Sequence, residues 1–261
     1  MKSSYFINLY SQFLKKFLKP ARPLKIVFDY SNGTAEMVLK KLKINNSKEK
    51  QADLGVIFDG DGDRALFVDD KGRSVDPDAV ARLLIWYLRP RKIVISAVVG
   101  QLVRKFRVFE TPVGHIFIAK KMMAEKADLG IEHSGHYYFK KFFYLDSGIL
   151  AAIEVINAVS RLPYKFSDFV DLLPASYRRE INFPTEKIKS LEKIENYFNL
   201  KPNTYNLKPK INRLDGLKIE FPDWWFNLRP SQTEPLWRLD IEAQDKNKLQ
   251  AEILNLEKIL L

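Results

Sequence analysis

The feature that most constrains this 261-residue chain is an acidic turn, DGDGDR, at residues 59–64. It directly follows an apolar run at residues 52–58, which predicts a buried strand. Asp59, Asp61 and Asp63 alternate with glycines, which accept backbone angles that other residues resist. Carboxylates held this close repel one another unless a cation lies among them. Because all-oxygen ligation favours Mg²⁺ or Ca²⁺, we expect a divalent-metal site here.

An EF-hand loop also begins D-x-D-x-D, but the following residues exclude it. Its sixth position requires glycine, where this chain has Arg64, and its twelfth requires glutamate, where this chain has Asp70. The preceding residues also have a strand pattern where an EF-hand has a helix. An ordinary solvated acidic turn is the other alternative, and two further motifs argue against it. Arg64 suits a phosphate partner, because guanidinium groups bind phosphate oxygens in a bidentate manner.

A second loop, GIEHSGH, occupies residues 130–136 at the end of a predicted short strand. It brings a carboxylate, a hydroxyl and imidazoles together within a few residues: Glu132, Ser134 and His136, with His133 between them. Such groups can form hydrogen bonds with neighbouring sugar hydroxyls, and a histidine can also shuttle protons. A purely structural role for these histidines is the alternative.

A third loop, RPSQTEP, occupies residues 229–235. An arginine, two hydroxyls, an amide and the N–H groups of a turn together suit a phosphate group. The residues concerned are Arg229, Ser231, Gln232 and Thr233. An ordinary turn bounded by prolines is the alternative for this segment taken alone.

Composition narrows the partners. The chain has no cysteine, which excludes disulfides, thiolate metal sites and cysteine nucleophiles and favours a cytoplasmic protein. Its formal net charge is +11, which suits an anionic partner. The basic residues are spread along the chain without a nucleic-acid motif, and no apolar run reaches the roughly 18 residues of a membrane span. We therefore expect neither nucleic acid nor membrane as a partner, although the charge keeps nucleic acid as an alternative.

The hydrophobic pattern predicts an α/β fold. An amphipathic helix near the N-terminus precedes strands at residues 24–30, 52–58, 93–99 and 128–131, with helices between them and a polar loop at 43–51. Residues 137–144 are aromatic and strand-like, and 148–162 form a long apolar helix. From about residue 163, charged helices, an alternating segment at 236–243 and an amphipathic helix at 246–261 predict a smaller α+β domain. The expected mixed-sheet α/β and α+β domains are residues 1–74, 75–163 and 164–261.

The three loops, in this order, resemble those of the α-D-phosphohexomutase family, in particular its bacterial phosphomannomutase/phosphoglucomutase branch. Residues 53–73 resemble the metal loop of that family, 127–152 its sugar-recognition loop and 215–243 its phosphate-binding loop. Residues 110–122 resemble the segment that carries a further active-site histidine, here His115. The resemblance covers nearly the whole chain.

This resemblance implies a set of roles. Asp59, Asp61 and Asp63 would ligate Mg²⁺ beside Arg64, while Glu132 and Ser134 would bind sugar hydroxyls and His136 would support that loop. The phosphate that is not transferred would be bound by the third loop, through Arg229, Ser231, Gln232 and Thr233. The implied activity is Mg²⁺-dependent interconversion of the 1- and 6-phosphates of hexoses such as mannose and glucose, through a bisphosphate intermediate.

The sequence departs from the family in one chemically important way. The family carries its phosphorylated serine in a first domain, in a T-A-S-H-N-P loop, and no Ser-His dipeptide occurs in these 261 residues. The chain opens on a segment similar to a shortened second domain. We therefore expect a phosphohexomutase-type protein whose phosphoserine domain is absent from this chain, either because the chain is incomplete or because another polypeptide supplies that domain. The alternative is a catalytically inactive phosphosugar-binding or regulatory homologue.

Overall fold

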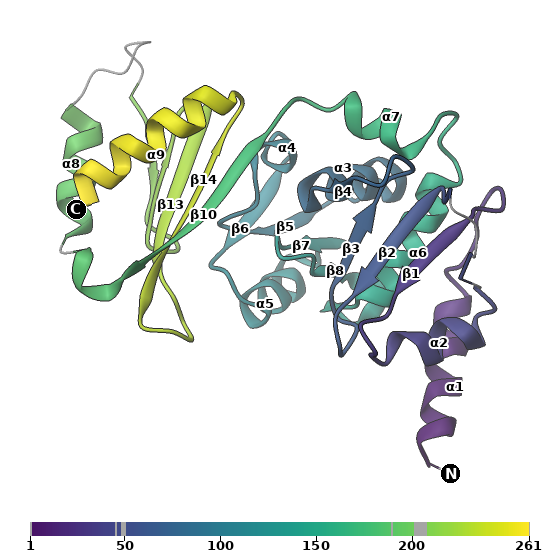
Figure 1. Cartoon of the computed structure of the whole chain (residues 1–261). Coiled ribbons are helices and arrows are strands. Elements are labelled where there is room, and N and C mark those ends of the chain that lie inside the picture. The colour runs from purple at the N-terminus through teal and green to yellow at the C-terminus, as the bar shows by residue number, and fades with distance from the viewer. Residues whose placement is uncertain (1, 45, 48–50, 189, 201–207, 261) are drawn as a thin grey trace. The chain divides into compact units, whose positions relative to one another are not determined.

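The computed structural model describes residues 2–44, 46–47, 51–188, 190–200 and 208–260. The chain divides into two compact units, residues 1–110 with 114–173, and residues 111–113 with 174–261. In the first unit, helices are interspersed with the strands of two sheets. In the second unit, two α-helices accompany one antiparallel sheet (Figure 1). The predicted α/β fold class is therefore confirmed, while the three predicted domain boundaries remain predictions.

The first sheet of unit 1 carries the acidic turn between two of its strands. Its order is β1-β2-β3-β4, with β1 parallel to β2 and the other neighbours antiparallel. Residues of β2 alternate between buried and more exposed positions, as expected for a strand with one face on the core. The elements of this region are α1 (Lys2–Lys15), β1 (Ile26–Asp29), α2 (Ala35–Lys41), β2 (Leu54–Phe58), β3 (Ala65–Val68) and β4 (Ser74–Val75).

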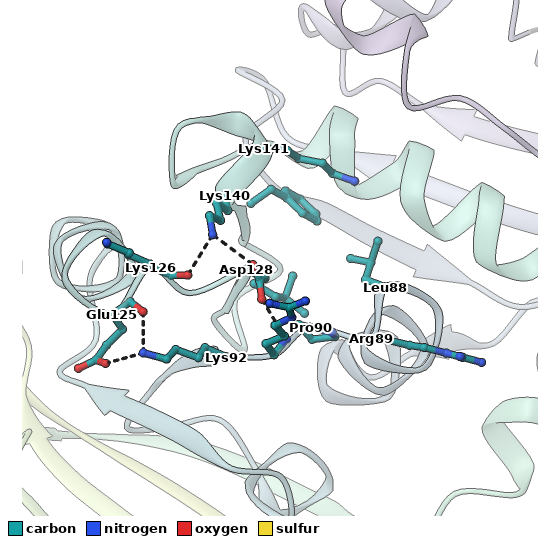
Figure 2. Close-up of a pocket in the computed structure, with 12 residues that line it drawn as sticks. Leu88, Arg89, Pro90, Lys92, Glu125, Lys126, Asp128, Lys140 and Lys141 are labelled. Atoms are coloured by element: carbon teal, nitrogen blue, oxygen red, sulfur yellow. Dashed lines mark hydrogen bonds and ion pairs between the residues drawn. The ribbon is translucent and has the colours of Figure 1, made fainter.

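The second sheet of unit 1 has the order β6-β5-β7-β8-β9. Because β5 and β7 are parallel, the segments that follow them emerge at one edge, and the segments that precede them lie at the other, where a pocket opens (Figure 2). The elements are α3 (Pro77–Leu88), β5 (Ile93–Ser96), α4 (Gln101–Arg104), β6 (Val108–Thr111), α5 (His115–Glu125), β7 (Leu129–Ile131), β8 (Tyr137–Phe139), η1 (Lys140–Phe142) and β9 (Leu145–Asp146).

Helix α6 (Gly148–Val159) is the centre of the unit 1 core, and all of its residues are buried. It contacts β2, β3 and α3 (Figure 1), and its residues share one core cluster with buried residues of both sheets. Ser147 caps the helix by accepting a hydrogen bond from the Leu150 N–H. The buried Asn157 receives the Lys19 N–H and donates to the Phe17 carbonyl, which fixes the segment after α1. A single apolar helix thus organises most of the unit.

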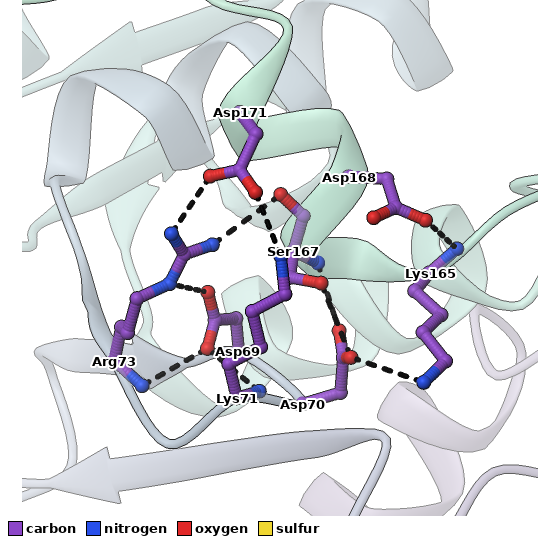
Figure 3. Close-up of polar contacts among 8 residues, drawn as sticks. All are labelled: Asp69, Asp70, Lys71, Arg73, Lys165, Ser167, Asp168 and Asp171. Atoms are coloured by element: carbon purple, nitrogen blue, oxygen red, sulfur yellow. Dashed lines mark hydrogen bonds and ion pairs between the residues drawn. The ribbon is translucent and has the colours of Figure 1, made fainter.

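A polar network fixes the turn after β3 against α7 (Phe166–Asp171) (Figure 3). The Asp70 carboxylate accepts hydrogen bonds from both the N–H and the hydroxyl of the buried Ser167, at 2.8 and 3.1 Å. Arg73 and Lys71 both form ion pairs with Asp171, at 2.7 and 2.8 Å. Hydrogen bonds from these two cations lower the pKa of Asp171. The network connects segments about a hundred residues apart in the sequence.

Unit 2 is a five-stranded antiparallel sheet, β10-β14-β13-β12-β11, with one apolar and one polar face. Trp224, Phe226 and Leu228 of β13 pack with Ile253 and Leu256 of the C-terminal helix in one core cluster. The alternate residues of β13 are Trp225, Asn227 and Arg229, opposite Glu242, Asp240 and Arg238 of β14. The elements are β10 (Tyr177–Pro184), η2 (Thr185–Lys187), α8 (Leu191–Leu200), β11 (Lys210–Asn212), β12 (Leu217–Glu220), β13 (Trp224–Pro230), β14 (Leu236–Ala243) and α9 (Lys246–Leu260).

Some local predictions need correction. The strand expected over residues 137–144 ends at Phe139, because a 3₁₀ turn follows and Phe143 and Tyr144 both adopt positive φ angles, of 58° and 65°. These angles reverse the chain, so β9 pairs back on β8. Residues 45 and 48–50 of the predicted loop, and residue 261 of the predicted last helix, lie outside the described residues. Within the described residues, no helix is both long enough and apolar enough to cross a membrane.

The network around α7 predicts unequal effects for two aspartates. Asp70→Ala leaves the buried Ser167 N–H and hydroxyl without their acceptor, so it should lower the free energy of unfolding by about 1–3 kcal/mol. Asp171→Ala removes only exposed ion pairs and should cost less than about 1 kcal/mol. Urea unfolding of both variants measures the difference. Equal losses would contradict the importance of the buried contact.

Candidate functional site

The acidic loop is held between two segments that are distant in the sequence. A Cβ on Gly33 would lie 2.4 Å from the Gly60 carbonyl oxygen, and one on Gly148 would lie 2.4 Å from the Arg64 carbonyl oxygen. Only glycine permits such close backbone approaches. The Gly148 N–H donates to the Gly62 carbonyl, and the Thr34 hydroxyl donates to the Asp61 carbonyl. The turn before α2 and the start of α6 therefore set the shape of this loop.

The three aspartates of the loop converge as the sequence predicted. Asp59, Asp61 and Asp63 each place one carboxylate oxygen within 4.8 Å of the others. Asp59 receives backbone N–H groups of the loop on one oxygen, and Arg64 Nε on the other at 2.6 Å. By contrast, Asp63 Oδ1 is buried and has no hydrogen-bond partner. The loop thus contains a ready-made oxygen donor that the protein itself leaves unsatisfied.

The electrostatics of the loop suit a cation. Burial, and then the neighbouring Asp59 carboxyl, raises the pKa of Asp63. Burial also acts to raise the pKa of Asp59, but hydrogen bonds, first among them that of Arg64, outweigh it and leave that pKa lowered. Hard oxygen donors of this kind, clustered and partly desolvated, fit a small divalent cation such as Mg²⁺.

The second loop lies directly against the first. Arg64 and His136 form a β-bridge, and the Ala65 N–H donates to the Gly135 carbonyl at 3.2 Å. Within the second loop, the Glu132 N–H donates to the His136 carbonyl at 3.0 Å, which closes a tight turn. The backbone therefore places the side chains of residues 132–136 next to the acidic loop.

Glu132 is the most firmly positioned side chain of the second loop. It is only 5% exposed. Its Oε1 accepts the Gly114 N–H at 3.0 Å, and its Oε2 accepts the Tyr138 hydroxyl at 2.6 Å. Burial, followed by the charge of Glu132, raises the pKa of Tyr138, so the phenol stays a neutral donor. Each carboxylate oxygen retains a lone pair that can accept a hydrogen bond from a ligand hydroxyl.

His136 connects the two loops. Its Nδ1 lies 2.8 Å from the Ser134 hydroxyl, and its Nε2 lies 3.5 Å from Asp63 and 3.9 Å from Asp146. Asp63, His136 and Asp146 form a second potential metal-ligating group. Burial raises the pKa of Asp146, against the opposing charge of His136. The imidazole is thus placed among carboxylates, where it can stabilise or exchange a proton.

The other two histidines have different surroundings. His115 is the exposed first residue of α5, directly after Gly114, whose N–H is bound to Glu132. His133 instead lies 3.2 Å from Asp78, whose other oxygen accepts the Gly100 N–H in the protein interior. His133 therefore anchors the loop to α3, and the structural alternative describes this residue best.

The third loop lies in unit 2, between β13 and β14. Arg229 is 8% exposed, and its guanidinium lies 3.8 Å from Asp215 and 3.9 Å from Asp240, too far for hydrogen bonds. Its Nε is buried without a hydrogen-bond partner. Ser231 Oγ receives the Thr233 N–H, while the Gln232 amide donates to the Val113 carbonyl. A partly unsatisfied arginine beside a hydroxyl-rich turn suits an anion.

Residues 76–177 match the family of phosphoglucomutase/phosphomannomutase, alpha/beta/alpha domain III. This segment contains the second loop and the helix that begins at His115. Residues 76–177 therefore form a domain of this family, and the chain resembles phosphohexomutases over nearly its whole length.

Relatives of known name agree with this family. The chain is 29% identical to a phosphomannomutase of Methanocaldococcus jannaschii over 97% of its own length and 66% of that protein. It is 32% identical to a phosphomannomutase of Salmonella typhimurium over 82% of its length and 49% of that protein. The chain thus spans about half to two thirds of the length of these relatives.

Solved phosphohexomutase structures share the fold. A phosphoglucomutase/phosphomannomutase family protein of Burkholderia thailandensis matches with a TM-score of 0.80 at 22% identity, covering 97% of this chain and 64% of that one. An N-acetylphosphoglucosamine mutase of Aspergillus fumigatus matches with a TM-score of 0.66 at 13% identity, over 98% of this chain and 65% of that one.

Two acidic groups near the predicted residues were not among the sequence predictions. Asp146 approaches His136, and its only sequence signal is its position directly before the Ser147 cap of α6. Asp215 approaches Arg229 and accepts the Val113 N–H. Burial raises the pKa of Asp215. The Asp146–His136 contact depends on the pairing of β8 with β9, and the Asp215–Val113 contact joins segments about a hundred residues apart, so no local pattern reveals either.

Asp63→Asn should weaken Mg²⁺ binding at least about tenfold, because it removes the charge of the carboxylate whose buried Oδ1 has no hydrogen-bond partner. Calorimetric titration with Mg²⁺ measures this change. Asp223→Asn, a substitution of the same kind in unit 2, serves as the control and should leave the affinity unchanged. Equal Mg²⁺ affinities of the two variants would refute the metal site.

Proposed function

We propose that this chain provides the metal, sugar and phosphate loops for Mg²⁺-dependent interconversion of hexose 1-phosphates and 6-phosphates. The observation that carries this proposal is the contact between the acidic loop and the loop of Glu132 and His136 within one unit. A metal site and a polar loop for a polyhydroxylated ligand thereby share one location. Magnesium, held by Asp59, Asp61 and Asp63, would neutralise charge on a phosphoryl group during transfer.

The residues of the chain have distinct parts in this proposal. Arg64, whose side chain is half exposed, is positioned to orient a phosphoryl group beside the acidic loop. Glu132 and Ser134 accept hydrogen bonds from sugar hydroxyls, and their bonds to Tyr138 and His136 hold them in place. Such fixed donors and acceptors accelerate transfer by orienting the reacting groups before the reaction.

Two histidines and the third loop also have roles in the proposed reaction. His136, whose Nε2 lies 3.5 Å from Asp63 and 3.9 Å from Asp146, is positioned to exchange a proton with a reacting hydroxyl. His115 lies next to the Gly114 N–H that positions Glu132. The phosphate that is not transferred is bound by the loop of unit 2, through Arg229, Ser231, Gln232 and Thr233.

Relatives support the ligand class. The Aspergillus fumigatus N-acetylphosphoglucosamine mutase was solved in complex with GlcNAc-6P and magnesium, and a serine-to-alanine variant of it in complex with glucose 1,6-bisphosphate. The proposed cycle passes through such a bisphosphate. A phosphoserine transfers its phosphoryl group to a free sugar hydroxyl, and the bisphosphate then returns its other phosphoryl group to the serine.

Within the 261 residues, no T-A-S-H-N-P segment supplies this serine. The donor must therefore come from sequence outside these residues. The proposal is tested by assaying conversion of mannose 1-phosphate and glucose 1-phosphate, with Mg²⁺, in the presence of a phosphoserine domain from a relative. Turnover that needs both partners supports the mutase activity. No turnover in either arrangement would refute it.

A second candidate is a phosphosugar-binding protein without turnover, because the contact between the acidic loop and the loop of Glu132 and His136 is sufficient for binding alone. Both candidates require hexose phosphates to bind, so calorimetry with hexose 6-phosphates and Mg²⁺ precedes the assay. Binding without turnover in the complemented assay would select the second candidate. Absence of binding would exclude both.

Two variants should separate recognition of the sugar from recognition of the phosphate. Arg229→Ala removes a cation from the third loop, so it should weaken hexose 6-phosphate binding about tenfold while leaving free hexose binding unchanged. Glu132→Gln removes a charged acceptor for hydroxyls, so it should weaken both ligands by similar factors. Calorimetry with both ligands measures this, and thermal melting confirms that the variants are folded. Equal losses of both ligands in Arg229→Ala would place the phosphate elsewhere.

A further inference from the structure

A pocket of about 680 Å³ opens in unit 1 at the edge of the second sheet opposite the Glu132 loop (Figure 2). Its walls come from the ends of α3 and α5, from the residues that precede β5 and β7, and from the end of β8. This volume lies within the roughly 300–1,000 Å³ usual for small-ligand sites. None of the residues assigned above to metal, sugar or phosphate lines it.

Basic side chains outnumber acidic ones in this pocket by six to two. Part of this charge has a structural role. Lys92 Nζ donates to the Glu125 carbonyl at 2.9 Å and lies 3.4 Å from the Glu125 carboxylate. Lys140 Nζ donates to the Lys126 carbonyl at 3.4 Å and lies 3.6 Å from Asp128. These two lysines therefore cap the C-terminal end of α5 and neutralise both acids of the pocket (Figure 2).

A third lysine, Lys141, forms an ion pair with the buried Glu154 at 2.6 Å, which leaves three cations of the pocket to consider. In the part of the chain that the structure describes, the side chains of Arg89, Arg91 and Lys126 have no hydrogen bond or ion pair. Arg89 and Lys126 follow helices, where the helix dipole favours a cation. That effect does not account for Arg91, which lies in the loop before β5 and donates only its backbone N–H, to Asp128.

The remaining residues of the lining include apolar side chains. Leu129 and Phe139 are 0% and 1% exposed, so they form the core side of the wall. Leu88 and Pro90 are partly exposed and offer apolar surface beside the cations. A smaller cavity of about 450 Å³ shares Arg91 and Lys92 and adds Arg107, which extends the basic surface.

We propose that this pocket binds an oligophosphate anion, a ligand with at least two phosphoryl groups. Arginine matches phosphate oxygens in a bidentate geometry, and lysine contributes a further point charge. Three cations without partners in one concave site can neutralise more charge than a single phosphate carries. The ligand is either a free oligophosphate or the phosphate chain of a nucleotide, whose apolar part would contact Leu88 and Pro90.

The test is calorimetry of the full chain at low ionic strength, with EDTA present, using inorganic tripolyphosphate and ATP. The double variant Arg91→Gln/Lys126→Gln should lower the affinity for the bound anion at least about tenfold. Arg179→Gln/Lys187→Gln removes the same charges from exposed positions in unit 2 and should leave the affinity nearly unchanged. If the first double variant melts early, Arg91→Gln alone replaces it.

The two ligands also identify the source of the phosphate. Tighter binding of ATP than of tripolyphosphate assigns a nucleotide, and equal binding assigns a free oligophosphate; either result supports the pocket. Absence of binding of both anions would overturn the proposal, as would equal losses in the two double variants. Loss of binding in Arg229→Ala but not in Arg91→Gln/Lys126→Gln would also overturn it, because the anion would then occupy the third loop.

Discussion

The close approach of backbone segments around the acidic loop is the constraint on which the rest of the site depends. Gly33 and Gly148 bring two distant parts of the chain against the loop at distances that no side chain would allow. Hydrogen bonds between Gly148 and Gly62, and between Thr34 and Asp61, hold these approaches in place. The fold therefore holds the aspartates close together. Packing elsewhere in the unit opposes the repulsion among their carboxylates.

Helix α6 supplies much of that packing. It is buried along its whole length, and it begins at the glycine that contacts the acidic loop. Of the two residues just before it, Asp146 lies 3.9 Å from His136 and Ser147 caps the helix. Core stability and site geometry are thus linked through one element. The polar network around Asp70 adds a second connection, from the turn after β3 to the helix that follows the core.

The second sheet has chemically different edges. At one edge, Glu132 and His136 lie among carboxylates and a buried phenol, which suits a hydroxyl-rich ligand and a cation. At the other edge, Arg89, Arg91 and Lys126 leave positive charge without a partner among the described residues. The formal net charge of +11 is therefore not only a general property of the surface, since part of it is concentrated in a concave site. The short parallel strands β5 and β7 each run from the basic pocket at their N-terminal ends to the side of the Glu132 loop at their C-terminal ends.

The sequence by itself determined the local features of this protein. Several features could be predicted because each depends on neighbouring residues. They are the strand before the acidic turn, the spacing of the three carboxylates, the apolar helix after residue 147 and the order of the three loops. The tertiary structure decided two contacts between distant segments, the close approaches of Gly33 and Gly148 to the acidic loop and the attachment of His133 to Asp78. It also decided the approach of Asp146 to His136, which depends on the reversal of the chain between β8 and β9. It also decided that the strand after Tyr137 ends early, since two left-handed residues reverse the chain there. Hydrophobic periodicity reports which face of an element is buried, but it carries no information on which distant backbone will lie against it.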